Sequence, residues 1–112
     1  MQTYDLAEHI AGDTWRGIPT ITITRNGSAL DLTGASVEMH VKFQIDAPTV
    51  ALFTTEDNSV IILNPSSSGV VQVPPQIVDV PPANYIWSFR VTLADGEVNT
   101  FVAGRWNIIK TA

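Results

Sequence analysis

The sequence predicts an all-β protein, built as an antiparallel two-sheet sandwich of about eight strands. Isoleucine and valine together number 23 against 6 leucines, and 12 threonines add further β-branched side chains, which favour strands over helices. Short apolar stretches alternate with turn signals at intervals of roughly 8–12 residues, as in sandwich domains. A small Greek-key barrel is the nearest alternative architecture. Because the 112 residues contain no linker or internal repeat, we expect one domain over residues 1–112.

The first part of the chain predicts strands separated by glycine-containing turns. We expect a short strand over Thr3–His9 and a longer one over Trp15–Thr24. Pro19 marks a bulge or a sheet edge in the longer strand, because proline cannot donate to a ladder. Asn26-Gly27 predicts a tight hairpin turn, since both residue types accept positive φ angles.

The middle of the chain predicts further strands and then a crossover between sheets. Alternation over Ala35–Gln44 indicates a half-buried strand, and its core-facing side chains are Val37, Met39, Val41 and Phe43. Thr49–Thr54 and Ser59–Leu63 are expected to pair as a hairpin, and Gly69–Pro74 to form a short strand. The prolines between positions 74 and 82 predict the crossover, with one helical turn at Gln76–Asp79.

The clearest pattern is a β-hairpin over residues 84–106. Its first strand alternates core side chains with outward ones, and the core set is Tyr85, Trp87, Phe89, Val91 and Leu93. Asp95-Gly96 predicts a two-residue turn. Tyr85 follows a proline-rich connection and fits the corner tyrosine of immunoglobulin-like (Ig-like) sandwiches, whose hydroxyl bonds to the preceding backbone.

This hairpin and the strand that continues it supply both structural residues and candidates for contact with a partner. The expected structural residues are Tyr85, Trp87, Asp95, Gly96, Gly104 and Trp106. The candidate interface consists of Ile86, Arg90, Arg105 and Ile109. Ile86 and Ile109 fall on the outward face, although scattered exposed apolar side chains are also common without any function.

The charge balance and the cysteine count limit the classes of partner. Eleven acidic against six basic residues give a net charge of −5, which repels phosphate backbones and anionic lipids, so we expect neither nucleic acid nor a membrane as a partner. The chain has no cysteine, hence no disulfide or thiolate nucleophile, and we find no signal peptide or membrane-spanning stretch. A charged fraction of 15% is low for a small soluble domain, so we expect other chains to cover part of the surface.

The sequence contains no motif for catalysis, a metal or a cofactor, so we expect a non-enzymatic protein. His9 and His40 lack metal-site spacing and are both expected to be exposed and chemically idle. Asp46, Glu56 and Asp57 could form an acidic rim for a divalent cation, but the Asp-x-Asp-x-Asp-Gly pattern of calcium loops is missing and a solvated loop explains the same residues. A small hydrolase would need two convergent carboxylates or a histidine paired with an acid.

Three tryptophans, together with Tyr4 and Tyr85, raise a second functional class, a module that binds host surface carbohydrate. Aromatic rings can stack on ligands when they are exposed and fill a core when they are buried. Trp87 is in phase with core residues, whereas Trp15 and Trp106 fit either role.

The order of several motifs resembles that of the small β-sandwich domains in bacteriophage and prophage tail proteins, including the N-terminal domain of baseplate upper proteins. The motifs are Gly12-Asp13-Thr14-Trp15, Asn26-Gly27, Asp31-Leu32-Thr33-Gly34-Ala35-Ser36-Val37, Asn84-Tyr85-Ile86-Trp87, Ala94-Asp95-Gly96-Glu97 and Gly104-Arg105-Trp106-Asn107-Ile108. The resemblance covers nearly the whole chain.

The resemblance implies a structural or adaptor component of a tail or baseplate that mediates protein–protein assembly. It implies other tail or baseplate proteins as partners, a homo-oligomer with a trimer favoured, and a place in the virion, assembled in the cytoplasm of a host bacterium. Because the chain ends at Ala112, without the coiled coil or receptor-binding domain of larger members, an adaptor is favoured over a complete receptor-binding protein.

Overall fold

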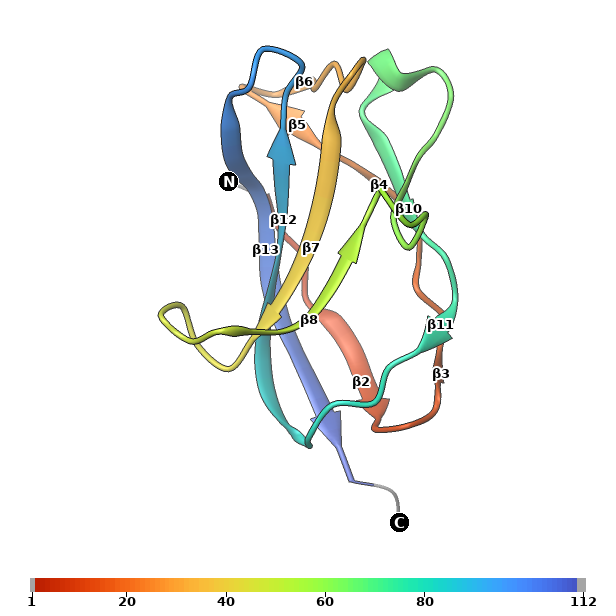
Figure 1. Ribbon diagram of the computed structural model, residues 1–112, viewed down its shortest axis with the longest axis vertical. Coiled ribbons are helices and arrows are strands. Elements are labelled where there is room, and N and C mark those ends of the chain that lie inside the picture. Colours follow the sequence, from red (N-terminus) through yellow and green to blue (C-terminus); the bar gives the residue numbers. More distant parts are fainter. Residues whose placement is uncertain (1, 111–112) are drawn as a thin grey trace.

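The computed structural model describes residues 2–110 and is all-β, as the sequence predicts. One large sheet has the strand order β1-β13-β12-β7-β8, and β2 also pairs with β13 (Figure 1). Both β1 and β2 run parallel to β13, whereas the other pairs of this sheet are antiparallel. Its strands are β1 (Gln2–Thr3), β2 (Leu6–Ile10), β7 (Ser36–Lys42), β8 (Thr49–Thr54), β12 (Ala83–Thr92) and β13 (Val98–Ile109).

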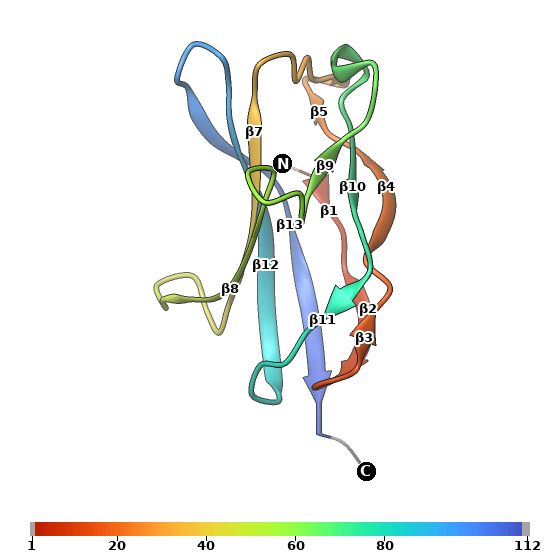
Figure 2. The same cartoon turned by 45° about the vertical axis from the view of Figure 1, so that its right-hand side comes forward.

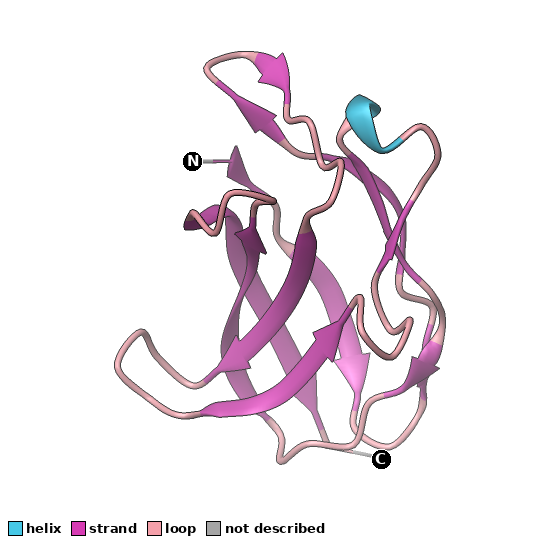
Figure 3. Cartoon of the chain, turned by 45° about the horizontal axis from the view of Figure 1, so that its top comes forward, coloured by secondary structure: helices cyan, strands magenta, loops and turns pink. Residues whose placement is uncertain are grey.

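Shorter strands form a second layer that faces the large sheet (Figure 2). They are β3 (Thr14–Trp15), β4 (Ile18–Thr22), β5 (Thr24–Arg25), β6 (Ser28–Ala29), β9 (Ile61–Ile62), β10 (Val70–Val73) and β11 (Gln76–Ile77). They pair as β4-β10-β9, β11-β3 and β5-β6, so the described chain has four hydrogen-bonded sheets, which do not close into a barrel. A short 3₁₀ helix, η1 (Ser66–Ser68), is the cyan turn in Figure 3.

The expected long strand over Trp15–Thr24 is divided into β3, β4 and β5. Glycine makes the first division possible: Gly17 has a φ of 78°, and a Cβ there would collide with the Val73 carbonyl of the neighbouring strand. Pro19 lies in β4, which is an edge strand of its sheet, as its missing N–H predicts.

The core lies between the two layers and is joined by tryptophans. The Trp15 ring from β3 lies 4.5 Å from the Trp106 ring of β13 and 6.0 Å from the Phe53 ring of β8, measured between centroids. Trp15, Trp87 and Trp106 are all buried, so the alternative that sequence left open for Trp15 and Trp106 is resolved as core.

Strand β12 follows the predicted alternation along its length. Tyr85, Trp87, Phe89 and Val91 are each at most 1% exposed, while the residues between them face outward or are half-buried. In β7 the same alternation buries three of the four predicted side chains, but Phe43 is half-exposed because β7 ends at Lys42. The Phe43 ring instead lies against the edge of the core, 5.0 Å from the Tyr85 ring.

The turn between β12 and β13 differs from the predicted two-residue type. Leu93 N–H donates to the Glu97 carbonyl at 2.8 Å, and Gly96 N–H donates to the Leu93 carbonyl at 2.9 Å, which leaves a three-residue loop. Gly96 has a φ of 91°, whereas Asp95 is not among the positive-φ residues. Asp95 instead accepts the backbone N–H of Glu97 through its Oδ1, at 2.9 Å.

Two other expectations for the middle of the chain are wrong. Thr49–Thr54 and Ser59–Leu63 do not form a hairpin, because β8 pairs with β7 and β9 pairs with β10 in the other layer. The predicted helical turn at Gln76–Asp79 is absent from the described chain: Gln76 and Ile77 form β11 and pair with β3. The pairing to a partner far along the chain outweighs the local turn signal.

The turn after β8 is organised by Asp57. Its Oδ1 accepts the backbone N–H of Ser59 at 2.9 Å and the Ser59 hydroxyl at 2.5 Å. These two bonds from Ser59 stabilise the ionised carboxylate and lower the pKa of Asp57 below its ordinary value of 3.8. The turn therefore retains a negative charge at neutral pH.

Replacing Tyr85 with Phe removes the hydroxyl that donates to the Pro81 carbonyl, the interaction predicted for a corner tyrosine. The ring stays buried in the variant, so we expect Tyr85→Phe to lower the free energy of unfolding by about 1 kcal/mol. Urea denaturation followed by tryptophan fluorescence measures the change. Tyr4→Phe is the matched control, because the Tyr4 side chain is 42% exposed; equal stability of both variants and the parent would refute this role.

Replacing Asp57 with Ala tests the charged turn through its pH dependence. Because folding lowers the pKa of Asp57, the ionised carboxylate contributes to the free energy of unfolding. This contribution is fully present above the ordinary pKa of 3.8 and is lost as the pH falls through the lowered pKa of the folded state. We expect Asp57→Ala to unfold at lower urea than the parent near neutral pH and the difference to vanish in acid. Glu56→Ala, at the exposed neighbouring position, is expected to show neither effect. A pH-independent difference would contradict the assignment.

Candidate functional site

The candidate site lies on the outer face of the large sheet, opposite the core. Alternation in β12 directs Ile86 outward, and the ladder places Lys42 of β7 on one side of it and Arg105 of β13 on the other. Directly opposed residues of neighbouring strands have Cβ atoms about 5 Å apart, so two cationic side chains flank one apolar side chain.

A groove of about 640 Å³ opens at this row of residues. The residues that matter for its chemistry are Asp5, Lys42, Ile45, Ile86, Gly104 and Arg105. Ile45 belongs to the loop between β7 and β8 and is 79% exposed, the highest value among the exposed large apolar side chains of the described chain. The groove thus combines an apolar floor and wall with basic borders.

The basic borders form no salt bridge with any residue that the structure describes. The salt bridges among residues 2–110 join Arg25 to Glu97 and His40 to Glu38, so Lys42 and Arg105 have no carboxylate within 4.0 Å. Asp5 lies in the groove, but its carboxylate accepts the backbone N–H of Arg105 at 3.0 Å. On a chain of net charge −5, this face therefore offers unpaired positive charge.

Gly104 forms part of the groove because the N-terminal segment crosses it closely. A Cβ at position 104 would collide with the Tyr4 carbonyl and lie 2.8 Å from Trp87 Nε1. Trp87 Nε1 donates to that same Tyr4 carbonyl at 2.9 Å. The buried indole therefore fixes the N-terminal segment at the border of the groove, and only glycine leaves room for it.

The structure brings together two of the four interface residues predicted from the sequence. Ile86 and Arg105 are cross-strand neighbours in the groove. Arg90 is exposed on the same strand, four residues further along, and lies opposite Thr100. Ile109 is half-buried at the far end of β13, where it pairs with Ile10, so it lies outside the groove.

Lys42 and Ile45 are among the groove residues that the sequence did not predict. Lys42 had a usable signal, because it falls on the polar face of an alternating strand. Ile45 had none, since a lone isoleucine in a loop gives no indication of which surface it joins.

The two histidines are less exposed than predicted. His9 is only 7% exposed, because β2 packs beside β13; its ring lies 5.9 Å from that of Trp106, and its Nε2 is 3.3 Å from the Val78 carbonyl. His40 is half-buried on the outer face, with Nδ1 2.9 Å from Thr49 Oγ1 and Nε2 3.4 Å from a Glu38 carboxylate oxygen.

The acidic rim considered for a divalent cation does not converge. Asp46 lies before β8, and Glu56 and Asp57 lie after it, so the strand separates them by six residues, or about 20 Å of extended chain. A search of the described residues finds no group of three or more histidine, cysteine, aspartate or glutamate side chains that is placed to hold a metal ion.

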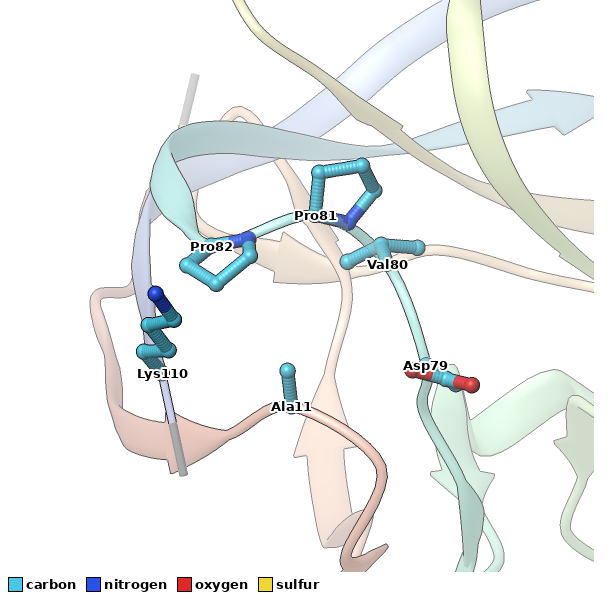
Figure 4. A pocket seen from close by; sticks show the side chains of 6 residues that line it. All are labelled: Ala11, Asp79, Val80, Pro81, Pro82 and Lys110. Atoms are coloured by element: carbon cyan, nitrogen blue, oxygen red, sulfur yellow. The ribbon is translucent and has the colours of Figure 1, made fainter. Parts of the chain in front are cut away.

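A second hollow, of about 590 Å³, lies at the end of the sheet where the proline-rich segment enters β12 (Figure 4). Val80, Pro81 and Pro82 form its apolar side, and Asp79 and Lys110 lie on opposite sides of the view. None of the predicted interface residues lines it. Its two charges are of opposite sign and balance, whereas the groove has two cations, Lys42 and Arg105, against the one carboxylate of Asp5.

Comparison of the chain with protein-family models, with curated proteins and with solved structures finds no match in any of the three. Over residues 2–110, the structure has no helix of the length and apolar character needed to cross a membrane.

Replacing Gly104 with Ala tests how the groove border is built. The added methyl group collides with the Tyr4 carbonyl, so we expect a loss of about 2 kcal/mol in the free energy of unfolding. Thr100→Ala on the same strand is the control, since Thr100 is exposed and its truncation is expected to change stability by less than about 0.5 kcal/mol. Chemical denaturation of both variants measures the change in stability. An unchanged denaturation midpoint for Gly104→Ala would contradict the close approach of the Tyr4 carbonyl to Gly104.

Proposed function

We propose that this protein is a non-enzymatic structural or adaptor component of a phage or prophage tail or baseplate. In this proposal it binds other tail or baseplate proteins through the outer face of its large sheet. The observation behind it is the groove in which Ile86 lies between the unpaired cations Lys42 and Arg105. Protein interfaces combine an apolar centre with a polar rim, and arginine is enriched in them.

The ordered motifs described above support the tail assignment. Each of three motifs contains a residue that the structure constrains. Trp15 is buried in the core, Gly104 lies against the N-terminal segment, and Tyr85 bonds to the Pro81 carbonyl at the start of β12. We further propose that the two facing layers constitute an Ig-like sandwich. The support is the corner hydrogen bond of Tyr85 and the inter-layer contact of Trp15 with Trp106.

The same proposal includes self-association, with a trimer favoured by the resemblance, and a location in the virion. A homo-oligomer would cover part of a surface that has a low fraction of charged residues. Binding of host glycans remains the alternative function. All three tryptophans and Tyr85 are buried, which leaves Tyr4 as the exposed ring of the aromatic set that suggested it.

Reversing the charge of Arg105 tests the proposed surface. Arg105→Glu places a carboxylate beside Ile86 and is expected to weaken binding to the tail and baseplate proteins encoded by neighbouring genes at least about tenfold. Binding is measured by co-purification and by titration calorimetry of the purified pair.

Arg16→Glu is the matched control, because Arg16 is exposed between β3 and β4 in the other layer. Its binding is expected to equal that of the parent chain. Equal binding by both variants would refute the groove as the interface. Failure of the parent to bind any tail or baseplate protein would refute the functional assignment itself.

A further inference from the structure

Strand β8 is the outermost strand on one side of the large sheet and pairs only with β7 within the described chain (Figure 1). Its six residues, Thr49–Thr54, include no charged residue and no proline. The side chains of Val50 and Leu52 are 37% and 47% exposed. Natural edge strands are usually blunted by charge, proline, bulges or a covering segment. Charge and proline are missing from β8, and the register shift in its pairing with β7 is confined to Val50 at its start.

The hydrogen bonds around β8 show which of its backbone groups are open. Thr55 N–H donates to the Val37 carbonyl of β7 at 3.1 Å, so by the alternation of an antiparallel ladder Phe53 and Ala51 also bond toward β7. Thr54 and Leu52 therefore direct their backbone groups away from the sheet.

The outward groups of Thr54 are already satisfied. Its N–H donates to the Ser59 hydroxyl at 2.8 Å, and its carbonyl accepts the Val60 N–H at 3.0 Å. Leu52 lies two residues earlier, where no strand within residues 2–110 provides a ladder partner for its outward N–H and C=O. The open part of the edge is thus centred on Leu52.

The charges at the two ends of β8 limit what can pair with this edge. Asp46 lies before the strand and Glu56 and Asp57 after it, and all three are exposed. Lysine and arginine are absent from residues 43–60. If β8 paired antiparallel with β8 of a second copy, Asp46 of each copy would face the acidic turn of the other, which like charges disfavour.

We propose that β8 accepts an additional strand from a different protein, an extended segment with an apolar centre and lysine or arginine at both ends. Its backbone pairs with Leu52, its apolar side chains contact Val50 and Leu52, and its basic ends lie near Asp46 and near Glu56 and Asp57. The inference rests on the proposed assembly function and identifies the kind of partner segment. The site is continuous with the groove, because Leu52 lies opposite His40, one of the groove residues.

The test uses the full chain and synthetic peptides. The probe peptide alternates threonine and valine in its centre and has lysines at both ends, and a matched peptide has glutamates there instead. We expect the lysine peptide to bind at least about tenfold more tightly and the same peptide with N-methylated central amides not to bind. Nuclear magnetic resonance detects the site: Leu52 N–H exchange with solvent should slow on binding, while Ala51 and Phe53, already bonded to β7, should not change.

Variants at position 52 separate backbone pairing from side-chain contact. Leu52→Pro removes the outward N–H without removing a bond to β7 and is expected to abolish binding, whereas Leu52→Ala keeps the N–H and retains most of it. If Leu52→Pro does not fold, two other measurements show whether the backbone pairs: binding of the N-methylated peptide, and solvent exchange of the Leu52 N–H in the parent chain.

Three results would overturn the proposal. One is equal affinity for the lysine and glutamate peptides, and another is an unchanged Leu52 exchange rate at saturation. The third is protection of Leu52 that appears without peptide and rises with protein concentration, which would identify a second copy as the occupant. Any of these can occur while tail proteins still bind the groove, so failure of this inference and failure of the proposed function are distinguishable.

Discussion

The alternation of side chains in β12 determines both faces of the large sheet. Tyr85, Trp87, Phe89 and Val91 all face the core and are almost completely buried. A shift of one residue in the pairing would move all four into solvent, so the register between β7, β12 and β13 is strongly fixed. The same register determines the other face, where it leaves Ile86 between Lys42 and Arg105. One alternation therefore places half of the β12 side chains in the core and the other half on the face that carries the candidate interface.

The buried aromatic residues also hold the segments at the ends of this sheet. Trp87 bonds to the Tyr4 carbonyl, Tyr85 bonds to the Pro81 carbonyl, and Trp106 packs against Trp15 of the second layer. Each of these side chains therefore combines apolar burial with a contact that positions another chain segment. The groove depends on this arrangement, because one of its borders is the N-terminal segment fixed by Trp87.

The sequence predicts correctly those features that depend on residues close together in the chain. The alternation of β12, the corner hydrogen bond of Tyr85 and the hairpin turn at Asn26-Gly27, where both φ angles are positive, follow from adjacent residues. Pairings between strands far apart in the sequence cannot be predicted from adjacent residues. Burial of His9 requires β2 to run beside β13, and the separation of β8 from β9 requires β9 to pair with β10. For the same reason the sequence predicts Arg105 and Ile86 as separate candidates. It does not predict that both lie beside Ile45 in one groove.

The central claim is that the outer face of the large sheet is the surface through which this protein binds its partners. Site-specific photo-crosslinking in cells that assemble the particle tests it most directly, with a benzophenone amino acid placed either at Ile86 in the groove or at Ile77 in the second layer. Ile77 is 69% exposed, and Ile86 is half-buried but lines the open groove, so a probe at either position can reach a neighbour. We expect crosslinks to a tail or baseplate protein from position 86 and few from position 77. Crosslinks from position 77 alone would contradict it.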